Sequence, residues 1–182
     1  MRKLGSTEIK LSEAQVKKLL EGLKDGKGVD NMVAELKTWC ESGLKDNCEI
    51  IDVLTADEVN AILKDTMGYE PPYKPGTSVY KIQLSENTKY VRVYDKINSN
   101  MQGSWIMRAE DVVGLTPIEI QSKFALPNTP IYICDVELKA GTLLRAGEVN
   151  PLFGYKGGGL QYDLIINGKK VGKFINERKI IQ

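Results

Sequence analysis

Histidine is absent from this sequence of 182 residues. Its absence excludes Ser-His-Asp and Cys-His nucleophiles, histidine metal sites and the histidine pair that many ribonucleases use as acid and base. Any chemistry must therefore use carboxylates, amides, hydroxyls, arginine, lysine or tyrosine. We expect no metal site and no cofactor beyond a substrate.

Cysteine is scarce, with Cys40, Cys48 and Cys134 only. Three cysteines build no disulfide framework and match no zinc spacing. Cys40 and Cys48 are eight residues apart, so they either form one bridge or stay reduced. Cys134 lies in the apolar run Ile131–Val136 and is expected in the core as a small apolar residue.

Long apolar runs are also missing, since none approaches the roughly 20 residues that cross a bilayer. The N-terminus MRKLGSTEIKLSE lacks the apolar stretch of a secretory signal, so no membrane association is expected. A fragment of a larger exported protein would look the same.

The net charge of +1 is unevenly distributed. Residues 1–70 hold 10 basic and 14 acidic residues, a net of −4, and residues 71–182 hold 15 and 10, a net of +5. The second part either attracts a phosphate-bearing ligand or shows ordinary surface variation.

The sequence predicts an α+β protein in two parts, residues 1–70 and residues 71–182. Capping boxes at Ser12 and Thr55, and apolar periodicity over 29–42, predict helices in the first part. Three prolines and a glycine in Glu70–Gly76 break the helical pattern, and we expect this break to isolate residues 1–68.

The second part is predicted to form a mixed or antiparallel sheet. Thr116-Pro117-Ile118-Glu119 predicts one helix that ends near Phe124. Asn167-Gly168 predicts a hairpin between the last two strands. The β-type runs are 78–84, 89–94, 103–107, 131–138, 143–146, 160–166 and 170–174.

Arg92 lies in the run Tyr90-Val91-Arg92-Val93-Tyr94. On a strand it shares one face with the two tyrosines, while the valines face the other way. This pattern fits either a phosphate clamp in an aromatic cleft or a solvent-facing arginine on an amphipathic strand.

Two further stretches carry candidate residues. Gly103-Ser104-Trp105 leads into a strand with a hydroxyl and a large aromatic ring, or simply ends a loop and fills the core. Gly157, Gly158 and Gly159 precede a strand, so they match neither a P-loop nor a Rossmann fingerprint. They form either a plain bend or a backbone surface that a ligand approaches closely.

Several stretches in this order resemble the C-terminal toxin domains of bacterial polymorphic toxins, including contact-dependent inhibition effectors. The likeness covers roughly residues 73–182 and is carried by Gly114–Pro130, Asp135–Gly147 and Gly157–Gln161. The run FGYKGGGLQ, from Phe153 to Gln161, is similar to the Phe-Gly-x-x-Gly-Gly-Gly-x-Gln run of the tuberculosis necrotizing toxin family of NAD-glycohydrolases. The arginine-phenylalanine-glycine element expected near Arg92 is missing.

The resemblance implies an ADP-ribosyltransferase-like fold and an NAD-consuming toxin domain in residues 71–182. Arg92 and Gln161 would be catalytic, with Ser104 as a mid-chain hydroxyl. NAD would be a substrate, held by Arg92, by an aromatic surface and by the glycine backbone. The NAD-contacting candidates are Arg92, Tyr94, Trp105, Phe153, Gly157, Gly158 and Gly159.

NAD hydrolysis is possible without histidine. Cleavage of the nicotinamide–ribose bond passes through an oxocarbenium-like state and releases a neutral leaving group, so no general acid is required. A hydrolase is favoured over a transferase because no Glu-x-Glu pair stands near Gln161.

Two other readings remain open. One is a metal-independent ribonuclease toxin that uses Arg92, Tyr155, Lys156 and Gln161 on an RNA phosphate. The other is a non-enzymatic binding module of a secretion or phage system. For a toxin, the resemblance implies delivery into a target cell as part of a larger effector, action in the cytoplasm, and a cognate immunity protein.

Overall fold

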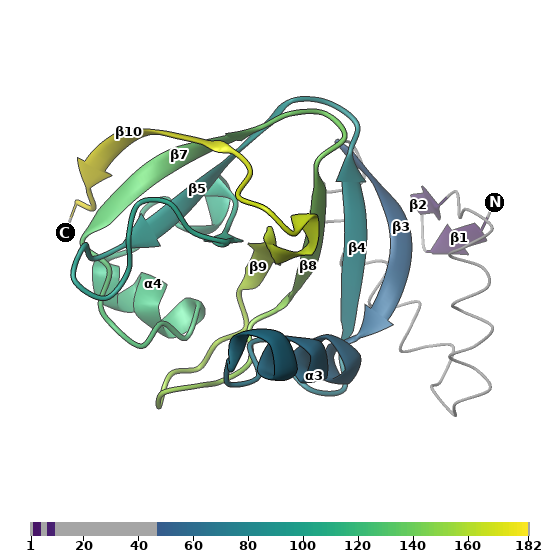
Figure 1. Ribbon diagram of the computed structural model, residues 1–182, viewed down its shortest axis with the longest axis horizontal. Helices are drawn as coiled ribbons and strands as arrows, with labels where there is room; N and C mark the ends of the chain where they lie inside the picture. The colour runs from purple at the N-terminus through teal and green to yellow at the C-terminus, as the bar shows by residue number, and fades with distance from the viewer. Residues whose placement is uncertain (1, 5–6, 10–46, 182) are drawn as a thin grey trace.

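The computed structural model describes residues 2–4, 7–9 and 47–181 (Figure 1). Four helical elements follow β3: the α-helices α3 (Ala56–Met67) and α4 (Pro117–Lys123), and the 3-10 turns η2 (Ala109–Asp111) and η3 (Ile165–Asn167). The strands are β1 (Arg2–Leu4), β2 (Thr7–Ile9), β3 (Cys48–Thr55), β4 (Ser78–Leu84), β5 (Thr88–Tyr94), β6 (Trp105–Ile106), β7 (Tyr132–Leu138), β8 (Leu143–Glu148), β9 (Leu160–Asp163) and β10 (Lys173–Lys179).

Two antiparallel sheets dominate the described part of the chain. One has five strands in the order β3-β4-β8-β9-β6, and the other has three in the order β10-β7-β5. Figure 1 shows α3 below the larger sheet and α4 beside the smaller one. The predicted α+β class is confirmed. No helix among the described residues is both long enough and apolar enough to span a bilayer.

Strand β5 contributes to two cores. Tyr90 and Tyr94 join the main core, which holds buried residues of both sheets. Val91 and Val93 pack in a second core with Ile120 of α4. The predicted alternation along residues 90–94 is therefore confirmed, and it places Arg92 on the side of the two tyrosines.

Both helices begin as the sequence predicts. The Thr55 hydroxyl accepts a hydrogen bond from the Glu58 N–H, and the Glu58 carboxylate accepts one from the Thr55 N–H. Thr116 and Glu119 repeat this capping box at the start of α4. These caps satisfy N–H groups that the first helical turn leaves without partners.

The Pro71–Gly76 break does not isolate the residues before it. Strand β3 pairs with β4 over most of its length, so the predicted helical region contains a strand of the large sheet. Helix α3 buries Val59 and Leu63 against Tyr73 and Val79. The expected helices before residue 43 lie outside the described residues, as does Cys40, and a domain boundary near residue 70 stays a prediction.

The Asn167-Gly168 hairpin prediction is wrong. Asn167 ends η3, and Gly168 follows it with φ of 68°. Strand β9 already pairs with β8 on one edge and with β6 on the other, so neither edge is open to β10. Strand β10 instead crosses to the small sheet and pairs with β7. Cys134 is fully buried in the main core, as expected.

Candidate functional site

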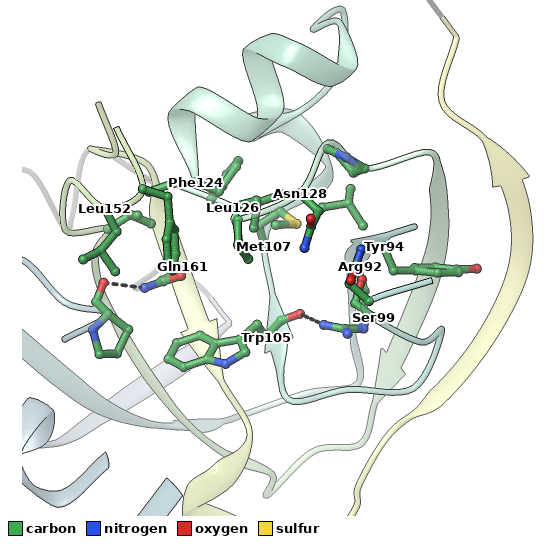
Figure 2. Close-up of a pocket in the computed structure, with 18 of the residues that line it drawn as sticks. Arg92, Tyr94, Ser99, Trp105, Met107, Phe124, Leu126, Asn128, Leu152 and Gln161 are labelled. Atoms are coloured by element: carbon green, nitrogen blue, oxygen red, sulfur yellow. Dashed lines mark hydrogen bonds between the residues drawn. The ribbon is translucent and has the colours of Figure 1, made fainter. Parts of the chain in front are cut away.

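A cavity of about 450 Å³ is lined by residues of both sheets. Five candidates from separate parts of the sequence line it: Arg92, Tyr94, Trp105, Phe153 and Gln161. Figure 2 shows Gln161 and Arg92 on opposite sides of this cavity, with Trp105 between them in this view. Cavities of this size commonly hold small ligands in proteins.

Arg92 is a buried cation whose side-chain partners, among the described residues, are carbonyl groups rather than carboxylates. Its Nε donates to the Asn100 carbonyl at 3.0 Å, and its Nη1 donates to the Trp105 carbonyl at 3.0 Å. Burial lowers the pKa of Arg92, yet a guanidinium stays protonated in proteins. This buried positive charge is not paired with a carboxylate and favours an anionic ligand, whereas the Asp95 carboxylate, which lines the same cavity, opposes one.

Gly103 explains how the guanidinium fits. A Cβ atom at this position would lie 2.3 Å from Cζ of Arg92. A side chain at this position would therefore displace the guanidinium from its two carbonyl partners. The sequence singled out the Gly103-Ser104-Trp105 stretch, and Gly103 and Trp105 both contact Arg92 in the structure.

Aromatic side chains form much of the cavity wall. The Trp105 ring lies 6.1 Å from the Tyr69 ring and 5.8 Å from the Tyr73 ring, in tilted arrangements. Tyr94 stacks on Tyr132 and donates its hydroxyl to Glu177. Phe153 is 53% exposed and has a φ of 55°, which is unusual for a residue with a side chain. Trp105 and Phe153 keep exposed ring surface that can stack on a planar ligand, whereas Tyr94 is 1% exposed and packs in the main core, so the predicted stacking role of Tyr94 is not supported.

Gln161 presents one end of its amide to the protein. Its Nε2 donates to the Pro72 carbonyl at 2.9 Å, as Figure 2 shows. Its carbonyl oxygen Oε1 is then available to accept a hydrogen bond. The two faces of β9 differ, because Tyr162 packs in the main core while Gln161 lines the cavity.

Behind Gln161 lies a buried polar network that the sequence did not indicate. Arg145 pairs with Asp163 at 2.9 Å, and the Tyr73 hydroxyl donates to Asp163 at 2.6 Å. Burial, followed by the Asp163 charge, raises the pKa of Tyr73 well above its usual value. The network anchors the segment whose Pro72 carbonyl holds Gln161.

The backbone of Gly157–Gly159 contacts the end of α4, whereas the ligand interpretation requires it to face a cavity. The N–H groups of Gly157 and Gly159 donate to the carbonyls of Ser122 and Lys123 at the end of α4. A Cβ at Gly157 would lie 2.6 Å from the Val149 carbonyl oxygen. The run therefore anchors its own loop to α4. The backbone that its glycines allow to come close belongs to the protein itself and not to a ligand.

Ser104 lines a different cavity from Arg92 and Gln161, together with Lys169 and Lys170. Its carbonyl accepts a hydrogen bond from the Leu164 N–H. The structure does not bring the Ser104 hydroxyl into the cavity of the other two catalytic candidates, and its catalytic role stays a prediction.

Sequence reasoning missed several cavity residues. Asn128 lies on the turn between Pro127 and Pro130, and all three line the cavity. An exposed polar residue held between two prolines is a signal that could have found this one, because rigid turns often carry binding residues. Asn98 and Ser99 also line the cavity, from the loop after β5. Among the described residues, no group of three or more Cys, Asp or Glu is placed to hold a metal ion.

Comparisons with known proteins add one similar structure. No protein-family model and no curated protein matches this sequence. The solved structure of Tne2 in complex with Tni2 is similar to it, with 16% sequence identity and a TM-score of 0.49. The alignment covers 59% of this chain and 97% of that one.

Proposed function

We propose that the cavity binds NAD and that the protein is a toxin domain that hydrolyses the nicotinamide–ribose bond. The observation that carries this proposal is the meeting of Arg92, an aromatic wall and Gln161 in one cavity. The resemblance of Phe153–Gln161 to the NAD-glycohydrolase run supports the same assignment. As a toxin domain, it would be delivered by a larger effector and neutralised by a cognate immunity protein.

Each group would act on a different part of the dinucleotide. The Arg92 guanidinium would pair with the pyrophosphate, and Trp105 or Phe153 would stack on nicotinamide. The Gln161 carbonyl oxygen would accept from a ribose hydroxyl or from the attacking water. No group in this scheme needs to titrate near neutral pH.

The reaction needs no metal-bound or histidine-bound water. Water adds to the anomeric carbon as the C–N bond breaks, the bonding electron pair leaves with nicotinamide, and one proton is released to solvent. The products are ADP-ribose and nicotinamide. Positioning of the reactants and stabilisation of the oxocarbenium-like state would supply the rate acceleration.

The ribonuclease alternative has less support from the geometry. It needs Tyr155 and Lys156 beside Arg92 and Gln161. Tyr155 packs in the core near α4, Lys156 is exposed, and the cavity wall is formed by other residues.

The test is nicotinamide release from NAD by the purified protein, with cleavage of total RNA measured in parallel. Arg92→Lys keeps the charge but loses the planar fork that reaches two carbonyls, so we expect catalytic efficiency to fall at least about 10-fold. Arg178→Lys is the matched control, because Arg178 is an exposed arginine paired with Asp135 at 3.2 Å. RNA cleavage without nicotinamide release would refute the proposal, and an active Arg92→Lys protein would refute the role of Arg92.

A further inference from the structure

The loop after β5 is wrapped around one carboxylate. Oδ1 of Asp95 accepts hydrogen bonds from the N–H groups of Ile97, Asn98 and Ser99, at 3.0, 2.8 and 3.0 Å. Oδ2 of Asp95 accepts from the Asn98 side chain at 2.8 Å. Asp95 is only 6% exposed. Three consecutive N–H groups on one oxygen fix the backbone of the loop.

This loop holds Arg92 and shapes the cavity. The Asn100 carbonyl at its end accepts from Nε of Arg92. Asn98 and Ser99 line the cavity themselves. At its start, Lys96 pairs with Glu177 of β10 and lies 4.2 Å from the centre of the Tyr132 ring. Both ends of the loop are therefore anchored, and Asp95 fixes the segment between them.

We infer that Asp95 is a positioning residue: its carboxylate holds residues 96–100 in the shape that fixes the Arg92 guanidinium for an anionic ligand. The identity of the anionic ligand as NAD rests on the proposed function. The presence of an anion site beside Arg92 does not. Asp95 lines the cavity too, where its negative charge opposes an anion, so weaker anion binding on its removal would come from the loop geometry that its oxygens hold and not from its charge. Arg92 itself donates to carbonyls and not to Asp95. Removing the carboxylate should therefore alter the orientation of Arg92 without changing the cavity wall formed by Trp105 and Gln161.

The experiment compares wild type, Asp95→Ala and Asp95→Asn by calorimetric titration with inorganic pyrophosphate and by nicotinamide release. Asp95→Ala should bind pyrophosphate at least about 10-fold more weakly, since a displaced binding group loses affinity and rate steeply. The Michaelis constant for NAD should rise while kcat changes less. Asp95→Asn keeps one oxygen acceptor but places an NH₂ group against the Asn98 side chain, so it should bind with intermediate affinity.

Glu58→Ala is the control for general loss of stability. Glu58 also accepts from a backbone N–H, at 3.0 Å, but it caps α3 away from the cavity. Its pyrophosphate affinity should equal that of wild type. Hydrogen exchange of the Ile97, Asn98 and Ser99 amides gives a direct readout, because it should accelerate in Asp95→Ala and not in Glu58→Ala.

The outcomes separate this inference from the proposed function. Wild-type affinity in Asp95→Ala overturns the inference and leaves the proposed function standing. If wild type binds pyrophosphate but releases no nicotinamide, the proposed function fails while weaker binding by Asp95→Ala still supports the inference. If wild type does not bind pyrophosphate, the anion site and the inference both fall. If Asp95→Ala does not fold, wild-type affinity in Asp95→Asn overturns the inference.

Discussion

At the scale of single residues, the Gln161 amide combines an internal and an external role. Its Nε2 is committed to the Pro72 carbonyl, and the other end faces the cavity. We expect Gln161→Ala to lower nicotinamide release about 100-fold, in the range that follows the loss of one stabilising hydrogen bond in an active site. The free energy of unfolding should fall by only about 1 kcal/mol, because the apolar packing of β9 comes from Tyr162.

The measurement is turnover together with thermal unfolding of the same preparation. Gln83→Ala is the control, since Gln83 is exposed and its amide also donates to a backbone carbonyl, that of Gly141. Full turnover in Gln161→Ala, or a collapse of the unfolding temperature, would make Gln161 a structural residue.

A second prediction at this scale concerns acid stability. Hydrogen bonds from the Asn98 side chain and from loop N–H groups hold the pKa of Asp95 well below its usual value, against the opposing effect of burial. A lowered folded-state pKa stabilises the protein above the unfolded pKa of about 3.9, and this stabilisation is lost as the pH falls below that value. Asp95→Asn should therefore lose less stability than wild type between about pH 4 and pH 2.

Urea unfolding midpoints measured across that pH range test this expectation. Asp135 and Glu177 also have lowered pKa values in the folded state, so some acid sensitivity should remain in the variant. Parallel curves for the two proteins would show that Asp95 is not held in its ionised form by the loop.

Individual site residues were predictable where a local pattern carried them. Arg92 stood out because tyrosines flank it at strand spacing, and Gln161 because it follows a glycine run. Tyr73 and Asp163 meet from positions 90 residues apart. A contact of that kind leaves no local pattern, so a single sequence could not indicate it.

At the scale of elements, we expect alanine substitutions in the glycine run to lower the free energy of unfolding by different amounts. Gly157 and Gly158 both have positive φ, at 64° and 89°. An alanine at Gly158 meets no atom within 4 Å, so it should cost about 1–2 kcal/mol of backbone strain. Gly157→Ala should lower the free energy of unfolding further, because its Cβ would also collide with the Val149 carbonyl.

Urea denaturation of the two single variants is the measurement. Equal stability for both, with ligand binding lost in Gly157→Ala alone, would contradict the anchoring role and restore the run as a ligand surface.

Elements with local start signals were predictable, and those decided by distant pairing were not. The capping boxes at Thr55 and Thr116 identified both described α-helices, since each box is complete within four residues. Asn167-Gly168 is the typical hairpin signal, yet β9 has a partner on each edge. The choice between a hairpin and a crossover was made by strands far away in the sequence.

At the scale of the whole molecule, β3 and α3 are part of the architecture that holds the cavity. Asn60 of α3 exchanges two hydrogen bonds with the Tyr73 backbone, at 2.8 and 3.1 Å. We expect a chain that begins at Glu70 to be unfolded or inactive, because it exposes Val79 and Tyr73 and leaves one edge of β4 unpaired.

A chain that begins at Asn47 is the matched comparison, since it keeps β3 and α3. Solubility, circular dichroism and pyrophosphate binding distinguish the two. A folded, active chain beginning at Glu70 would show that the break near Pro71 is a true boundary.

Helical and strand-rich stretches could be recognised from composition, whereas the order of strands in each sheet could not, because it depends on contacts between distant segments.

Arg92 also joins the two sheets, since it lies on β5 and donates to the carbonyl of Trp105 on β6. A change at Arg92 therefore alters the proposed site and a joint between the sheets together, whereas a change at Gln161 alters the proposed site and removes one hydrogen bond, to the Pro72 carbonyl. Natural variants that lose activity but still fold should accordingly accumulate at Gln161 and be rare at Arg92. Under the proposed function, a lineage that keeps the fold and loses the activity would diverge first at Gln161.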